Sequence, residues 1–506
     1  MGAVRPGYDL ANDPEKEVSG PGAVQSCLVS FVEILVVGVA VGLVVARWAP
    51  VRVRRGVTVG AAALAGLSAV IVVGLGVRWQ MVPVLAGAVL AGVGLALPFA
   101  VGSLSRRGAR RPSWRARWWV AAPGTAVCLL LVAAGPVAAW AFPVPEFPAP
   151  SGPYATGTVV LQWTDQDRPE PATAAPDDHR IVVAQLWYPA RPSPAGAARA
   201  PYFGRTQREA RTVAQALAGQ LGLPGFILDA LPRARTRSVA GAPVAAGRFP
   251  VVLFSPGIGS VRGQNTAWAE ELAGRGYVVA GLDHPYDSAA VVLDDSRVIH
   301  TRARATGDAA TDERLAADLT ATRAGDLSFA LTRLDRLDRD EPGGPFAGRL
   351  DVGRAAATGH SLGGGAALLA ARQDTRFAAV IDVDGYPHDP APAPFPQPAL
   401  ALTSAIGLDE NPRYLPQLTR VLTLGTATTY RLTIPGMAHF AFTDAPFYLP
   451  PVPFLVGDLG DRDALRSTTE TTAAFLDVAL RGGPGDLPSV LARFGDVAVH
   501  RPGRVP

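Results

Sequence analysis

The sequence has few of the residues that hold small frameworks together. Its 506 residues include 2 cysteines, Cys27 and Cys128, and both lie inside apolar runs, which excludes a disulfide framework from the polar part of the chain. Neither a C-x-x-C nor an H-E-x-x-H motif is present. We therefore expect neither a metal site nor a cofactor.

Charge is also scarce. Charged residues make up 18% of the chain, below the soluble average of about 25%, and the formal net charge is +4. Lysine occurs once, at Lys16, so arginine supplies nearly all of the positive charge. No Lys/Arg-rich run interleaved with aromatic residues occurs in the C-terminal two-thirds of the chain, and we expect no nucleic-acid partner.

Long apolar runs are abundant, but only in the first part of the chain. Each of four runs is long enough to cross the ~30 Å hydrocarbon core of a bilayer, which takes about 20 helical residues: residues 24–46, 57–77, 81–104 and 118–140. We predict an N-terminal tail over residues 1–23 and a four-helix transmembrane region over residues 24–141. Glu33 lies within the first run, where it is either a buried polar contact inside the helix cluster or a functional intramembrane carboxylate.

The loops between these runs predict the orientation. The loops after the first and third runs are both rich in arginine, whereas the turn between the second and third runs carries only Arg78. Because arginine-rich loops stay on the cytoplasmic side, the N-terminus and the region after the fourth run are expected outside. The sequence thus predicts a multi-pass protein of the cell membrane with its C-terminal domain on the extracytoplasmic side.

The composition changes after the fourth run. The segment "FPVPEFPAPSGP", residues 142–153, alternates prolines and predicts an extended, semi-rigid linker of about 3.1 Å per residue. Over residues 154–506, short apolar runs alternate with helical stretches, for example at 266–275, 314–334, 363–373 and 468–480. This alternation predicts a mostly parallel sheet with helices on both faces, an α/β fold. We expect strands at "RIVVAQLWYP", "FPVVLFSPG", "YVVAGLDHP", "RAAATGHS", "FAAVIDVDG", "PALALTS" and "TYRLTIPG".

One strand-to-helix turn carries a G-x-S-x-G motif, in "ATGHSLGGG" at residues 357–365. With 54 glycines in the chain the bare pattern is modest evidence, but its position between the strand "RAAAT" and the helix "LGGGAALLAAR" is that of a nucleophile elbow. There Ser361 must hold a strained backbone, and Gly359 and Gly363 remove Cβ atoms that would clash with the neighbouring helix and strand. We therefore expect Ser361 to be a nucleophile and the fold to be an α/β-hydrolase.

Such a nucleophile needs a histidine base that is oriented by an acid, in the chain order Ser, Asp, His. Of the three histidines after the motif, we expect the base to be His439, in "IPGMAHFAFTD", because His388 follows too soon after a strand and His500 lies in a Gly/Arg/Pro-rich tail. The strand in "VIDVDGYP" offers Asp382 and Asp384, which alternation places on one face. Only Asp384 lies beyond the strand tip, so we predict that Asp384 is the acid.

A tetrahedral intermediate needs backbone donors for its oxyanion. The N–H of Leu362, the residue after the nucleophile, is one expected donor. The loop "FSPGIGS" follows an early strand and supplies the other, which we assign to Ile258, with Gly257 and Gly259 allowing a tight approach.

These stretches resemble the platelet-activating factor acetylhydrolases and, more broadly, the bacterial lipases and dienelactone-hydrolase-like esterases. The resemblance covers roughly residues 181–480 and is carried by "FPVVLFSPGIGSVRGQ", "AEELAGRGYVVAGLDHPYDSA", "GHSLGGGAALLAARQDTRFAAVIDVDGYP" and "IPGMAHFAFTD". It implies an α/β-hydrolase fold, the same triad and oxyanion residues as above, and no calcium requirement. The family's loop commonly reads S-H-G-x-G; here Pro256 replaces the histidine, which alters the hydrogen bonding of the loop but leaves the later backbone donor in place.

We therefore expect a membrane-anchored serine ester hydrolase that cleaves short acyl esters of phospholipids. The alternatives are a lipase, an esterase for polyesters or acylated metabolites, and a non-catalytic membrane sensor that retains the fold. Two segments have open roles. Residues 207–231 form either a lid or ordinary packing over the sheet, and "FYLPPVPFLV" at 447–456 either lines an acyl pocket, contacts lipid or is a buried proline-rich loop.

Overall fold

The computed structural model describes residues 21–46, 78–104, 118–339, 343–408 and 411–502, with isolated positions between 48 and 66. The chain divides into two compact units, Met1–Trp140 and Ala141–Pro506. The first unit is helical in its described part, and the second combines strands with helices.

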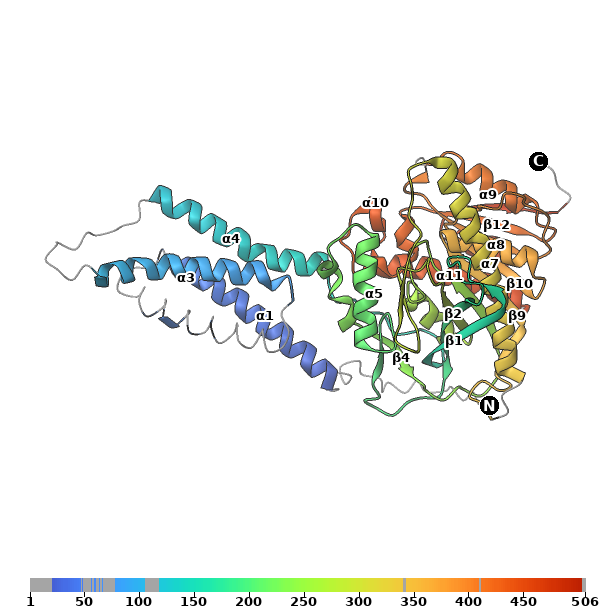
Figure 1. Cartoon of the computed structure of the whole chain (residues 1–506), viewed down its shortest axis with the longest axis horizontal. Helices are drawn as coiled ribbons and strands as arrows, with labels where there is room; N and C mark the ends of the chain where they lie inside the picture. Colours follow the sequence, from blue (N-terminus) through green and yellow to red (C-terminus); the bar gives the residue numbers. More distant parts are fainter. Residues whose placement is uncertain are drawn as a thin grey trace, which may run out of the picture. The chain divides into compact units, whose positions relative to one another are not determined.

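The first unit contains helices α1 (Pro21–Ala46), α3 (Met81–Leu104) and α4 (Trp118–Ala141) in its described part (Figure 1). Among the described residues one helix, Ala122–Ala141, is long and apolar enough to cross a membrane. Glu33–Ala46 and Met81–Leu95 are apolar but shorter. The predicted second span, residues 57–77, lies almost wholly outside the described residues. One candidate span is therefore supported, and the four-span arrangement stays a prediction.

Glu33 lies in α1 and pairs with a cation. Its Oε2 atom is 3.1 Å from Nη1 of Arg78, and both side chains are mostly buried. The same helix packs against α3 through small and branched apolar side chains such as Ala40, Leu43 and Val84. This ion pair favours a buried polar contact over a free intramembrane carboxylate.

The second unit is built on an 11-stranded sheet. Its strands from β12 to β6 are parallel neighbours, and β13 and β2 flank them in antiparallel orientation. In spatial order the strands are β13 (Asp496–His500), β12 (Thr429–Ile434), β11 (Ala399–Ser404), β10 (Phe377–Val383), β9 (Leu350–His360), β5 (Phe249–Ser255), β6 (Val278–Asp283), β2 (His179–Ala190), β1 (Ala155–Pro169), β4 (Arg235–Ala240) and β3 (Arg199–Pro201). A short separate pair is formed by β7 (Ala290–Val292) and β8 (Val298–His300).

Helices cover both faces of this sheet, as the alternating pattern predicts. The apolar side chains of α7, α8 and α9 join one core cluster, and those of α6, α11 and α12 join another. The bounds are α5 (Gln207–Gln220), α6 (Thr266–Gly274), α7 (Ala309–Arg339), α8 (Leu362–Gln373), α9 (Tyr414–Thr423), α10 (Pro453–Val456), α11 (Gly460–Arg481) and α12 (Leu487–Leu491), with single turns η2 (Gly225–Leu228), η3 (Leu231–Arg233), η5 (His439–Phe442) and η6 (Ala445–Phe447). The fold is that of an α/β-hydrolase.

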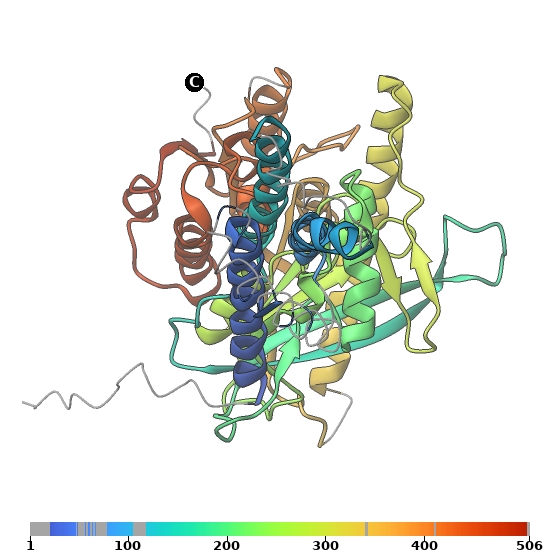
Figure 2. The same cartoon turned by 90° about the vertical axis from the view of Figure 1, so that its left-hand side faces the viewer.

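The strands that the apolar pattern misses lie mainly at the edges of the sheet. The central strand β5 is buried along its whole length, and such strands read as continuous apolar runs. In contrast, β1 is buried near its start, half-buried in its middle and largely exposed at its end, which has the polar sequence "TDQDRP". It pairs with β2 as a long antiparallel hairpin, which Figure 2 shows extending sideways from the sheet.

The proline-rich segment 142–153, called the strap below, belongs to the second unit and packs against the rest of it. Phe147 is 1% exposed and contacts the rings of Tyr202 and Phe447. Its backbone oxygen accepts a hydrogen bond from Arg237 at 2.6 Å. The linker expected from the prolines is thus extended but held along the domain, because its aromatic residues find an apolar cluster there.

Two segments with open roles contribute to this same cluster. In α5 the buried face consists of Ala210, Val213 and Ala214, so the 207–231 segment packs over the domain. In the 447–456 segment Phe447 is buried, whereas Phe454 in α10 is 76% exposed. The second segment therefore has a buried beginning and an exposed apolar end.

Candidate active site

Ser361 lies at the turn between β9 and α8. Its backbone angles are φ 57° and ψ −126°, a strained conformation for a residue with a side chain. Gly359 and Gly363 face each other across this turn, and a Cβ atom on either would overlap backbone atoms. The sharp turn from strand to helix forms because the two glycines let the backbone segments pass close to each other. The half-buried Ser361 side chain therefore lies at the end of the strand.

Asp384 and His439 come from two other strand ends. Asp384 follows β10 with φ 52°, and its N–H donates to the backbone oxygen of Leu402 in β11 at 2.7 Å. His439 begins η5 after β12. Its Nδ1 atom lies 2.7 Å from Oδ2 of Asp384. We call Ser361, His439 and Asp384 the candidate triad.

The second carboxylate oxygen of Asp384 is held by neutral donors. Oδ1 accepts the N–H of Ser404 at 2.8 Å and the hydroxyl of Tyr414 at 3.2 Å. Burial alone would raise the pKa of Asp384, but its hydrogen bond with His439 and these contacts lower that pKa below its ordinary value. The carboxylate is therefore charged and fixed, and it can orient an imidazole.

The other acids and histidines considered from sequence lie elsewhere. Asp382 is buried under the turn against Gly364 and Gly385, and burial together with the charge of Asp384 raises its pKa well above the usual range. His388 pairs with Glu313 at 3.0 Å, and His500 lies in the edge strand β13.

Two successive peptide groups of the oxyanion loop are pinned by side chains. The N–H of Gly257 donates to Oε1 of Gln264 at 3.0 Å. The buried guanidinium of Arg323 donates to the backbone oxygens of Pro256 and Gly257, the second at 3.2 Å. In a trans peptide the C=O and the following N–H point in opposite directions. The N–H of Ile258 is consequently directed away from Arg323. A Cβ atom added to Gly257 would lie 3.6 Å from Cβ of Ser361, so the loop passes close to the nucleophile.

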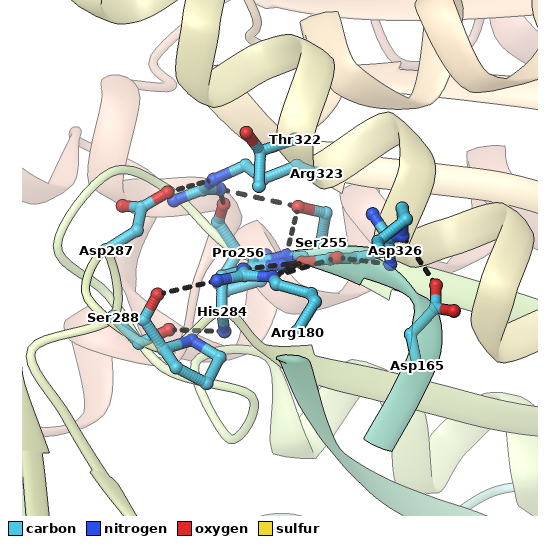
Figure 3. A network of polar contacts seen from close by, with 12 residues as sticks. Asp165, Arg180, Ser255, Pro256, His284, Asp287, Ser288, Thr322, Arg323 and Asp326 are labelled. Carbon is cyan, nitrogen blue, oxygen red and sulfur yellow. Dashed lines mark hydrogen bonds and ion pairs between the residues drawn. The ribbon is translucent and has the colours of Figure 1, made fainter. Parts of the chain in front are cut away.

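Arg323 is itself held by a buried carboxylate. Its Nε atom donates to Asp287, whose other oxygen lies 3.5 Å from the N–H of Gly259. Figure 3 shows Arg323 between Asp287 on one side and Ser255 and Pro256 on the other. The ion pair and its neighbours hold the loop in place from below. Separating the pair would leave a buried charge without its partner, which costs folding free energy.

A second Ser–His–Asp arrangement lies beneath this loop (Figure 3). Oγ of Ser255 is 2.9 Å from Nε2 of His284, whose Nδ1 atom is 2.8 Å from Oδ2 of Asp326. Arg180 also donates to Asp326, at 2.7 Å. We call Ser255, His284 and Asp326 the buried array, because all three side chains are fully enclosed.

Known proteins resemble this chain over parts of its length. The family described as platelet-activating factor acetylhydrolase, isoform II matches residues 180–305. Platelet-activating factor acetylhydrolases of Cavia porcellus and Bos taurus are 26% and 24% identical over 41% and 45% of this chain. The matches span 51% and 56% of those proteins, so the chain spans about half the length of the curated relatives it matches.

A solved structure is similar over a longer range. A ferulic acid esterase from Streptomyces cinnamoneus is 30% identical, with a TM-score of 0.57, over 70% of this chain and 99% of its own. The chain belongs to the platelet-activating factor acetylhydrolase-like family of α/β-hydrolases. This membership places it among the carboxylic ester hydrolases. The segment matched by the family ends before Ser361, so the candidate triad rests on its geometry and on the sequence motif.

Sequence reasoning missed the residues that support the candidate triad and the oxyanion loop. Tyr414, Gln264, Arg323 and Asp287 bear on it only through contacts between distant segments. His360, next to the nucleophile, is visible in the motif itself, but the motif alone does not indicate its role. No group of three or more His, Cys, Asp or Glu side chains in the described ranges is arranged to hold a metal ion.

Proposed function

We propose that this protein is a membrane-anchored serine ester hydrolase in which Ser361 is the nucleophile, His439 the base and Asp384 the acid. The observation that carries the proposal is the 2.7 Å contact between His439 and Asp384 beside the strained turn of Ser361. This combination is specific, because it joins the ends of β9, β10 and β12 at one edge of the sheet.

The reaction follows from the protonation states. Because Nδ1 of His439 donates to Asp384, Nε2 is the unprotonated nitrogen and accepts the hydroxyl proton of Ser361 as Oγ attacks the ester carbonyl. The imidazolium that forms is stabilised by Asp384 and then protonates the leaving alcohol. Water, deprotonated by His439, attacks the acyl-enzyme and releases the acid.

The N–H groups of Ile258 and Leu362 stabilise the oxyanion in this proposal. Leu362 is the first residue of α8, so its N–H has no partner within the helix, and the helix dipole favours negative charge there. The N–H of Ile258 is turned to the opposite side from Arg323 by the hydrogen bond on Gly257. Removal of one such donor typically costs about 3–4 kcal/mol of transition-state stabilisation.

The substrate class is a short acyl ester of a phospholipid. The two curated relatives are named platelet-activating factor acetylhydrolases, which supports cleavage of a short acyl chain. Ile258, beside the proposed oxyanion hole, is half exposed, and the exposed Phe454 lies on α10, which packs against η5. Both offer apolar contacts for the lipid part of a substrate near His439.

The structural neighbour supports a second candidate. This neighbour is a ferulic acid esterase, and the similarity covers 99% of its chain. An aromatic acyl ester is therefore the alternative substrate, and the same triad would act on it. The two substrates differ in the acyl group, short and aliphatic in one and a planar aromatic acid in the other.

Membrane anchoring is proposed from the helix Ala122–Ala141 and the apolar runs before it. The strap begins directly after this helix, and its Phe142 and Val144 pack on the cluster that also contacts Phe440, the residue after the proposed base. The proposal keeps the N-terminus and the catalytic domain outside the cell membrane. Protease added to intact cells should then cleave the domain, and protection in intact but not in disrupted cells would reverse the orientation.

The test of activity uses the full-length protein in detergent. We expect turnover of p-nitrophenyl acetate and covalent labelling of Ser361 by a fluorophosphonate. Faster turnover of methyl ferulate than of p-nitrophenyl acetate would favour the aromatic esterase, and preference for p-nitrophenyl octanoate would favour a lipase. A folded protein that neither turns over these esters nor labels would favour the non-catalytic sensor.

A further inference from the structure

The proposed base and the oxyanion loop are joined by side chains that take no part in the chemistry above. His360, the last residue of β9, is 1% exposed, and its ring centroid lies 4.5 Å from that of His439. Nε2 of His360 is 2.9 Å from the backbone oxygen of His439. Nδ1 of His360 is 3.0 Å from Nε2 of Gln264. His360 therefore bridges two loops directly beside the nucleophile.

The direction of each hydrogen bond follows from what each atom can donate or accept. Oε1 of Gln264 accepts the N–H of Gly257, so the NH₂ group of Gln264 faces His360 and donates to Nδ1. An imidazole that accepts at Nδ1 carries its proton on Nε2, and it donates that proton to the carbonyl of His439. Burial and the charge of His439 lower the pKa of His360 to about 3, so this neutral form persists at neutral pH.

The same segment holds the His439 turn at two further points. Nδ2 of Asn265 donates to the backbone oxygen of Phe442 at 2.6 Å. The N–H of Asp444 donates to the backbone oxygen of Gln264 at 3.0 Å. These bonds fix the end of η5 and the residues after it. Of these hydrogen bonds, the one from His360 reaches the backbone of His439, so it positions the proposed base together with Asp384, which holds the ring.

We propose that Gln264 and His360 are positioning residues that form a hydrogen-bonded relay from the oxyanion loop to the backbone of the catalytic histidine. The inference rests on the proposed function. The relay fixes the distance between the groups that take the proton of the nucleophile and those that receive the oxyanion. Both relay side chains are buried, His360 at 1% and Gln264 at 6% exposure, so the relay is expected to act on the rate of the chemical step and to leave substrate binding unchanged.

The test is a double-mutant cycle on the full-length chain in detergent, with p-nitrophenyl acetate as substrate. Gln264→Met removes both polar ends of the amide at similar length, and His360→Phe removes both ring nitrogens. Each should lower kcat about 10- to 100-fold, with KM changed by no more than about twofold, because a displacement near 1 Å can cost roughly 100-fold in rate. The double variant should lose no more than the worse single variant, since links of one chain fail together.

Losses that multiply in the double variant, or a change confined to KM, would overturn the relay. Gln264→Glu covers the case in which the methionine variant does not fold. It keeps the acceptor for Gly257 but has no donor for His360, so kcat should fall in the same way, and kcat at the wild-type level would contradict the relay.

Two further variants serve as controls. Gln397 is as buried as Gln264 and donates to the backbone oxygen of Ala371, away from the site. Gln397→Met should lower the free energy of unfolding but leave kcat unchanged. Ser361→Ala separates the two hypotheses: activity in that variant refutes the proposed function, whereas an inactive Ser361→Ala beside unimpaired Gln264 and His360 variants refutes only the relay.

Discussion

The candidate triad and the buried array contain the same residue types with the same contacts, yet we assign chemistry to only one of them. Each histidine contacts its aspartate through Nδ1, at 2.7 Å for His439 and 2.8 Å for His284. The side chains of the buried array are 0% exposed, whereas 41% of the His439 side chain is exposed. Solvent therefore reaches the histidine ring of the candidate triad, whereas the side chains of the buried array are closed to it.

Charge separates the two arrangements as well. Burial, together with the charge of Arg323, lowers the pKa of His284, so an imidazolium is disfavoured there. Asp326 also bonds Arg180, which already balances its charge. In the candidate triad, neutral donors hold Asp384, and its charge remains available for His439. Connectivity alone therefore does not make a catalytic site; access and a charge balance that tolerates the imidazolium are also required.

The largest expected difference between the two arrangements is at the serines. Ser361→Ala should lower kcat by roughly 10⁴-fold or more, because removal of a nucleophile removes the covalent route. Ser255→Ala removes a hydroxyl that bonds His284 and Arg323 and should mainly lower the free energy of unfolding. Ester turnover and urea unfolding of both variants are the measurements. A catalytic loss of equal size in Ser255→Ala would place the buried array in the reaction.

The aspartates sharpen the comparison. Asp384→Asn should lower kcat roughly 10⁴-fold with little loss of stability, because the amide favours the wrong tautomer of His439. Asp326→Asn leaves Arg180 as a buried charge without its main partner and should cost about 3–5 kcal/mol of unfolding free energy. Kinetics and denaturation on the same preparations distinguish the effects. The reverse pattern would exchange the roles of the two arrangements.

The arginines beneath the loop give the next largest effect. Arg323→Lys retains the charge but cannot contact Pro256, Gly257 and Asp287 together, so we expect kcat to fall roughly 10- to 100-fold with KM little changed. Arg180→Lys is the matched control: it weakens the pair with Asp326 but makes no contact with the loop peptides. The control should lose stability and retain kcat within about threefold. Equal kinetic losses would show that loop position is not what Arg323 controls.

The smallest expected effect is the pH dependence of stability. The pKa of His284 lies below its ordinary value in the folded state, and in the unfolded chain it returns to about 6.5. As pH falls through that value the unfolded chain binds a proton that the folded chain does not, so stability is lost by at most about 1.4 kcal/mol per pH unit. His284→Gln should show a shallower decline between pH 7.5 and 5.5 in urea unfolding. Parallel curves for the two proteins would contradict this assignment.

Particular elements show how far sequence reasoning reaches. The central strands β5, β6, β10 and β11 were predictable because each is a nearly continuous apolar run that ends in a turn residue, and β9 and β12 because a shorter apolar run is followed by a turn signal. The peripheral strand β1 and the edge strand β13 were not, because both have exposed or half-buried positions whose polar residues hide the pattern. The strap was predicted to be extended, but its packing depends on an apolar cluster formed by residues far away in the chain.

The sequence by itself determined the order of the central strands and their helices, the glycine-bounded serine turn and the acid and histidine expected with it. These features depend on local periodicity and on backbone conformations that few residues adopt, so they can be predicted from the sequence. Only the tertiary structure decided which side chains hold these residues in place. Arg323 and Gln264 form hydrogen bonds with the loop peptides, His360 with the backbone of His439, and Tyr414 with the carboxylate of Asp384. Such hydrogen bonds join segments that meet only after the sheet has formed, and a residue's type does not specify its distant partner.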